Sequence, residues 1–154
     1  MSDTANDRHK EGVSLASRGN YQEAIDAFNE AIELDPEYAE AYYNRGHVYY
    51  WNRGDLRQAI KDYDRAIELN PEYAEAYCGR GIAYENLTDY QQAFRDYDKA
   101  IELNPKFVKA YYSRGYAYWR VGDLTQAIKD MKVASRLGSK AAQAYLKTRH
   151  IEWR

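Results

Sequence analysis

Apolar and polar positions alternate along this chain with the period of helical faces. Tyr77, Gly81 and Tyr84 lie four and three residues apart, which places them on one face of a helix. Residues 87–89 interrupt that pattern with Leu-Thr-Asp, and the aspartate can cap a following helix. A second apolar stripe then runs through residues 93–101. The pattern predicts two amphipathic helices joined by a short turn.

The same pattern recurs along nearly the whole chain. Pro36, Pro71 and Pro105 each follow the phrase Ala-Ile-Glu-Leu and an Asp or Asn. A fixed period of about 34 residues indicates a repeat architecture. We therefore predict a single domain spanning 1–154, with repeats at about 5–38, 39–73, 74–107 and 108–138, and a capping helix at about 139–153. The second repeat holds one extra residue within 52–55, which predicts a longer turn between its helices.

Small residues recur at fixed places in each repeat and predict close helix packing. A glycine stands within each first helix, although glycine there costs roughly 0.5–1 kcal/mol relative to alanine. The glycines and the corresponding second-helix alanines are Gly12, Gly46, Gly81 and Gly115, and Ala24, Ala59, Ala93 and Ala127. Such small groups let the two helices of a repeat approach closely while larger side chains fill the surrounding space.

This pattern resembles that of the tetratricopeptide repeat family. In the second repeat the matching residues are Gly46, Tyr49, Ala59, Tyr63, Ala66 and Pro71. The resemblance implies an all-α, right-handed α-solenoid of four antiparallel helix pairs plus a C-terminal capping helix. It also implies a concave groove, lined by the first helix of each pair, that binds peptides or other proteins.

The resemblance implies which positions of each repeat line the groove. The expected peptide-binding residues are Tyr43, Asn44, His47, Tyr50, Trp51, Cys78, Ile82, Lys109, Tyr112, Tyr116, Trp119 and Arg120. The same positions also hold Gly79, Glu85, Asn86 and Ser113, as well as His9, Val13, Ala16 and Ser17 in the first repeat. These positions account for many of the aromatic residues that the repeat core does not need, namely four tyrosines and two tryptophans. The third repeat offers Cys78, Gly79 and Ile82 where its neighbours present aromatic rings, which predicts a shallow notch in mid-groove.

Comparison of the four repeats with one another predicts ion pairs. Repeats two to four hold an arginine before the packing glycine and an aspartate in the second helix, whereas the first repeat lacks both. Joint absence favours pairing within a repeat, because pairing with a neighbouring repeat would leave one member without a partner. The predicted structural pairs are Arg45–Asp62, Arg80–Asp96 and Arg114–Asp130.

Charge and composition limit the possible functions. The net charge of −2 gives no general attraction to nucleic acid, and no apolar run reaches the length that a membrane helix needs. The N-terminal residues contain no apolar stretch, so we expect no signal peptide and a cytoplasmic location. Three dispersed histidines and a single cysteine predict no metal site, no cofactor and no catalytic group.

The sequence thus favours a non-enzymatic scaffold that binds a protein or peptide of unknown identity in an aromatic groove. The alternative is a self-assembly module that uses the same groove or the C-terminal helix, so the chain is expected to be a monomer or a weak homo-oligomer. A more distant alternative is an adaptor that clamps the terminal carboxylate of chaperone tails. The clamp positions hold His9, Val13, Asn44, Glu75 and Gly79, of which Asn44 alone matches. Cations near the C-terminal end, including Lys109 and Arg120, would suit an acidic stretch in a partner.

Overall fold

The computed structural model describes residues 4–152, and within them the chain is helical without strands. Helices alternate with short turns, and the predicted pairs are present. In order, the helices are α1 (Ala5–Ser17), α2 (Tyr21–Leu34), α3 (Ala39–Val48), η1 (Tyr49–Arg53), α4 (Leu56–Leu69), α5 (Ala74–Asn86), α6 (Tyr90–Leu103), α7 (Val108–Arg120), α8 (Leu124–Arg136) and α9 (Lys140–Lys147).

Local sequence sets where these helices begin. The carboxylates of Asp55, Asp89 and Asp123 accept the backbone N–H three residues further on at 3.1–3.2 Å, which caps the second helix of three repeats. The second helices end where Asn70 and Asn104 adopt extended backbone before a proline. The turn chemistry visible in the sequence therefore defines the helix pairs.

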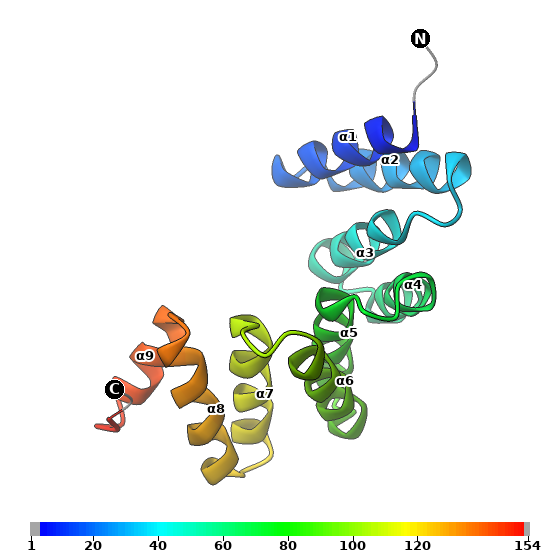
Figure 1. The fold of residues 1–154 in the computed structure, drawn as a ribbon. Helices are drawn as coiled ribbons and strands as arrows, with labels where there is room; N and C mark the ends of the chain where they lie inside the picture. Colours follow the sequence, from blue (N-terminus) through cyan, green and yellow to red (C-terminus); the bar gives the residue numbers. More distant parts are fainter. Residues whose placement is uncertain (1–3, 153–154) are drawn as a thin grey trace.

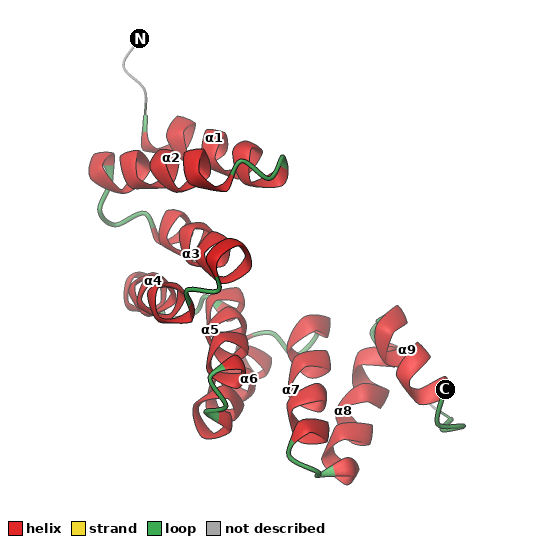
Figure 2. Cartoon of the chain, turned by 180° about the vertical axis from the view of Figure 1, so that it is seen from behind, coloured by secondary structure: helices red, strands yellow, loops and turns green. Residues whose placement is uncertain are grey.

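The helix pairs stack into a curved array. Each helix packs on the next along the chain, and the first helices of neighbouring repeats also touch, α1 against α3 and α5 against α7. Figure 1 shows the array winding from α1 and α2 at the N-terminal end to α9 at the other. The opposite view in Figure 2 shows that only short loops join the helices. The predicted fold class, an all-α solenoid of helix pairs, is confirmed.

Small residues occur where the two helices of a repeat meet. A Cβ atom added at Gly46 would lie 3.1 Å from the carbonyl oxygen of Ala59, and one at Gly81 would lie 2.9 Å from the ring of Tyr97. Ala59 and Ala93 are fully buried in the facing helices. Glycine at these positions therefore permits a close approach of the two helices, and a larger residue would require neighbouring atoms to shift.

The predicted ion pairs are present within repeats two to four. Arg45 donates from Nε and Nη2 to the two carboxylate oxygens of Asp62 at 2.9 and 2.7 Å. Arg114 binds Asp130 in the same two-point manner at 2.7 and 2.8 Å. The remaining Nη1 of each arginine reaches the preceding repeat, where Arg45 meets Asn29 and Arg114 meets Asp98. Assigning one partner to each arginine missed this second contact, which ties neighbouring repeats together.

The extra residue of the second repeat is absorbed differently from the prediction. It widens the end of the first helix into the π-helical turn η1, closed by a bond from the Gly54 N–H to the Tyr49 carbonyl. A π-turn accommodates one inserted residue without breaking the helix, and such turns are frequent at functional sites. This turn carries Tyr50 and Trp51, two of the predicted groove residues.

The capping helix is shorter than predicted. It ends at Lys147 rather than near Trp153, which lies outside the described residues. His150 adopts a left-handed φ of 55°, and the Ile151 N–H bonds back to the Leu146 carbonyl at 3.0 Å. Ile151 then packs on the buried cluster around Leu146. No helix among residues 4–152 has both the length and the apolar character needed to cross a bilayer.

Candidate functional site

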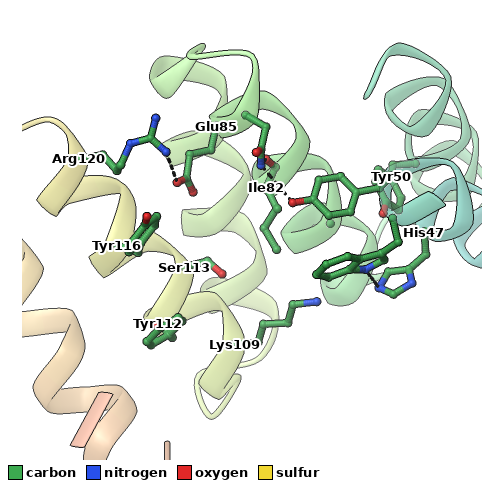
Figure 3. Close-up of a pocket in the computed structure, with 13 residues that line it drawn as sticks. His47, Tyr50, Ile82, Glu85, Lys109, Tyr112, Ser113, Tyr116 and Arg120 are labelled. Carbon is green, nitrogen blue, oxygen red and sulfur yellow. Dashed lines mark hydrogen bonds and ion pairs between the residues drawn. The ribbon is translucent and has the colours of Figure 1, made fainter. Parts of the chain in front are cut away.

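Two open cavities adjoin one another along the first helices of the repeats. The central cavity has a volume of about 370 Å³ and lies between α3, α5 and α7. The N-terminal cavity has a volume of about 310 Å³ and lies between α1, α2, α3 and the π-turn. His47 and Trp51 line both cavities and therefore form the divider between them. Figure 3 shows the central cavity with side chains converging from three helices.

Most of the predicted groove residues meet at these cavities. The central cavity is lined by the predicted residues His47, Tyr50, Trp51, Ile82, Lys109, Tyr112, Tyr116 and Arg120. Asn44 lines the N-terminal cavity instead. Tyr43 lines neither cavity and packs against the rings of Tyr63 and Tyr73. Trp119 also lies outside them, half-exposed beside Tyr116 with ring centroids 5.5 Å apart.

The mid-groove notch is a correction to the sequence prediction. Cys78, expected on the groove surface, is only 1% exposed and packs in the core with Ala93 and Tyr97. The space above Gly79 is filled by Tyr63, whose ring would lie 2.9 Å from an added Cβ. Tyr63 belongs to a second helix, so a rule restricted to first helices missed it. Its ring passes beside Gly79 and forms part of the cavity lining.

The divider between the cavities is an aromatic unit held by hydrogen bonding. Trp51 donates from Nε1 to Nε2 of His47 at 3.1 Å, which leaves the proton of a neutral His47 on Nδ1. Tyr50 meets Trp51 edge-on with ring centroids 5.1 Å apart. Trp51 nevertheless remains 63% exposed. A large indole presented to solvent in this way is typical of a recognition surface.

Charges of opposite sign occupy different ends of the central cavity. Figure 3 shows Lys109 extending from α7 toward the side formed by His47 and Tyr50, and Glu85 beside Arg120 at the other end. Glu85 is 6% exposed and accepts a hydrogen bond from the Tyr97 hydroxyl at 2.7 Å. Burial raises the pKa of Glu85, while Tyr97 and Arg120 oppose this shift. Burial, aided by the charge of Lys109, lowers the pKa of His47.

A hydrogen-bonded histidine links the first two repeats near the N-terminal cavity. The side-chain amide of Asn44 donates to Nε2 of His9 at 2.8 Å, so Nδ1 carries the proton toward the Tyr38 hydroxyl at 3.0 Å. Burial lowers the pKa of His9. Two of the five clamp positions are therefore bonded to each other, and Val13 and Glu75 supply no cation to hold a terminal carboxylate.

The site offers little for covalent chemistry. Burial raises the pKa of Cys78 to about 12, which keeps its thiol protonated and unreactive. Among residues 4–152, no three side chains of His, Cys, Asp or Glu are placed to hold a metal ion. What the cavities do provide is aromatic surface with a few directed polar groups, an arrangement suited to binding.

Comparison with known proteins agrees with this architecture. Models described as TPR repeat match residues 12–52 and 51–87, and models described as tetratricopeptide repeat match residues 74–107 and 96–129. One curated relative, the uncharacterized protein MJ0572 of Methanocaldococcus jannaschii, is 40% identical over 37 residues, which cover 24% of this chain and 43% of that protein. The chain thus matches less than half the length of this relative.

Solved structures extend the likeness over most of the chain. The crystal structure of MamA superposes with a TM-score of 0.79 at 32% identity, covering 90% of this chain and 81% of that one. The first TPR of Spaghetti (RPAP3), solved bound to an HSP90 peptide, superposes with a TM-score of 0.74 at 27% identity, covering 79% of this chain and 95% of that one. With repeat matches from residue 12 to residue 129 and this helix-pair stack, the chain belongs to the tetratricopeptide repeat family.

Proposed function

We propose that this protein is a non-enzymatic interaction scaffold that binds an extended segment of another protein along its first helices. The observation that carries the proposal is the pair of adjoining cavities, which share the His47–Trp51 divider. Together they form an open surface lined by residues of all four repeats, which suits an extended chain better than a small molecule that needs one enclosed pocket.

The character of the lining supports a protein ligand. On the lining, Trp51 and Tyr116 are 63% and 39% exposed, although each would gain by removal of its apolar surface from water. Trp119, outside the cavities but beside Tyr116, is 39% exposed as well. Tyrosine and tryptophan dominate binding energy in protein interfaces because their large rings lose little conformational entropy on binding. Backbone amides and side chains of an extended segment would also find partners in Asn86, Ser113 and Tyr112 on the cavity walls.

The relative with a bound peptide gives this proposal a precedent. The first TPR of Spaghetti (RPAP3) holds an HSP90 peptide on a fold that superposes over most of this chain. We extend to this chain the use of the fold for peptide binding, but not the peptide. A cytoplasmic location is part of the proposal.

A peptide display selection tests the proposal even though the partner is unidentified. A library of random peptides, fused at both ends to constant sequence, is selected on the wild-type protein, and the bound peptides are synthesised. We expect the double variant Trp51→Ala/Tyr116→Ala to bind them about tenfold or more weakly. The matched control is Leu34→Ala/Leu124→Ala, which removes exposed apolar side chains outside both cavities and should bind normally.

Two outcomes would contradict peptide recognition. One is a selection that yields no binder; the other is a set of binders indifferent to the Trp51 and Tyr116 changes. Light scattering over a concentration series accompanies the selection, because a mass that rises with concentration in the absence of binders would favour the self-assembly alternative. Circular dichroism of each variant establishes that any loss of binding is not a loss of fold.

A further inference from the structure

The central cavity has a polarity that the repeat fold does not require. The second position of the second and third repeats holds Glu40 and Glu75, whereas the fourth repeat holds Lys109 there. This position lies in the first turn of the helix, where the helix dipole favours an anion and disfavours a cation. The charge of Lys109 therefore does not stabilise helix α7.

No carboxylate of the described residues lies within ion-pair distance of the Lys109 ammonium group, although Glu75 and Lys109 both act electrostatically on Cys78. The charge of Lys109 also acts on His47 by lowering the pKa of that imidazole. Ser113 lies one helical turn further along the same face of α7 and lines the same cavity. Lys109 thus brings a cation, and Ser113 a hydroxyl donor, to one end of an aromatic cavity.

The other end of the cavity is electrostatically different. The position of Glu85 is occupied by Ala16, Tyr50 and Trp119 in the other repeats, so the fold itself needs no carboxylate there. The Tyr97 hydroxyl holds one carboxylate oxygen of Glu85, and the other lies 3.9 Å from Nη1 of Arg120. Glu85 offsets the charge of Arg120, although the sequence pattern had grouped Arg120 with Lys109. Of the two cations on the cavity lining, Lys109 is therefore the one without a carboxylate at ion-pair distance among the described residues.

We infer that the central cavity selects an extended segment whose internal Asp or Glu side chain is bound by Lys109 and Ser113, and that Glu85 excludes a second acidic side chain at the Arg120 end. This inference rests on the proposed function and specifies the chemistry of its partner. A carboxylate at Lys109 would complete a charge-assisted hydrogen bond, the strongest kind that such a surface offers. A carboxylate at the other end would meet a buried charge of the same sign.

The display selection, repeated on charge variants, tests this polarity. We expect peptides selected by the wild type to be enriched about threefold or more in Asp and Glu at one position, because complementary charge sets specificity. Lys109→Glu should replace that enrichment with Lys and Arg, whereas the control Lys61→Glu, exposed on α4, should leave it unchanged. Glu85→Gln should admit a second acidic residue, because Arg120 then lacks its neighbouring carboxylate.

A quantitative measurement on one selected peptide completes the test. With its C-terminus amidated, replacement of its acidic residue by the matching amide should weaken binding about tenfold to wild type and hardly at all to Lys109→Gln. Equal losses for both proteins, or binding abolished by the terminal amide, would overturn the side-chain assignment. Binders without acidic enrichment would overturn this inference while leaving the proposed function intact, whereas the absence of any binder would defeat both.

Discussion

Arg80 and Asp96 form a two-point ion pair inside the third repeat. Arg80 in α5 donates from Nε and Nη2 to the two carboxylate oxygens of Asp96 in α6 at 2.8 and 2.7 Å. Its third nitrogen, Nη1, bonds to Asp64 in α4 of the preceding repeat at 2.6 Å. Burial opposes the charge of Arg80, but the two aspartates outweigh it and raise the pKa of the guanidinium. One arginine therefore fixes both the packing within a repeat and the stacking between repeats.

The two aspartates should contribute very differently to stability. Asp96→Asn leaves a largely buried guanidinium without its counter-charge and should reduce the free energy of unfolding by about 2–3 kcal/mol. Asp64→Asn should cost about 0.5 kcal/mol or less, because the Asp64 side chain is 43% exposed and its pair is screened by solvent. Urea unfolding monitored by circular dichroism measures both losses.

A double variant tests whether the loss of stability comes from leaving one buried charge unpaired. Arg80→Met/Asp96→Leu removes both charges and should be less destabilising than Asp96→Leu alone, because no unpaired buried charge remains. Equal stability of the Asp96→Asn and Asp64→Asn variants would mean that burial does not distinguish the two contacts.

Filling the space above Gly79 should damage the fold rather than the surface. The mid-groove notch expected from the sequence would tolerate Gly79→Phe, but the ring of Tyr63 already occupies that space. Tyr63 is 1% exposed and cannot move aside freely, so we expect Gly79→Phe to lower the free energy of unfolding by about 3 kcal/mol.

Thermal unfolding measures the effect of Gly79→Phe, and Tyr63→Leu provides the comparison. The smaller leucine vacates part of the contested space, so adding Tyr63→Leu should recover some of the stability that Gly79→Phe loses. A Gly79→Phe protein as stable as wild type would show that the notch is open after all.

The contrast between Gly79 and Gly81 illustrates how much of the fold the sequence could predict. Gly81 recurs in each repeat, so its role in helix packing was visible by internal comparison, as were the proline-bounded pairs and the arginine–aspartate contacts. Gly79 occurs once, and its role depends on a ring from another helix. Features that recur in every repeat can be predicted by comparing the repeats with one another. A contact that occurs in one repeat alone can be identified only from the three-dimensional structure.

The candidate site shows the same division. Position rules found His47, Tyr50, Lys109 and most of the other first-helix residues because each helix presents one face to the cavities, but Tyr43 and Trp119 lie outside both cavities. They missed Tyr63, misplaced Cys78, and did not reveal that Arg120 lies near Glu85. That contact depends on which side chains meet across α5 and α7. The extra residue of the second repeat led to the prediction of a longer turn. Its actual position, within a π-turn at the end of the first helix, depends on backbone geometry that the sequence pattern does not show.

Cys78 should resist thiol reagents until the protein unfolds. Its thiol is buried, and the rise of its pKa from 9.0 to about 12 reduces the reactive thiolate roughly a thousandfold near neutral pH. Reaction with a disulfide reagent at mildly alkaline pH should therefore be slow for the native protein and fast in denaturant. A native rate close to the denatured rate would place the thiol at the surface, where the sequence pattern had put it.

Acidification should weaken the junction between the first two repeats through His9. The imidazole accepts a hydrogen bond from Asn44 only when neutral, and burial lowers its pKa below the ordinary value of 6.5. The unfolded chain then binds the proton more readily, so the stabilisation is complete above about pH 6.5 and is lost progressively as the pH falls toward the lower folded pKa.

His9→Gln removes the titrating group, and its urea midpoint should change less than that of wild type between about pH 7.5 and pH 5.5. His47, whose pKa burial also lowers, contributes in the same direction, so His47→Gln serves as the parallel variant. Hydrogen exchange of α1 assigns the effect, because loss of the His9 contacts should speed exchange there first. An unchanged pH dependence in His9→Gln would assign the titration to other groups.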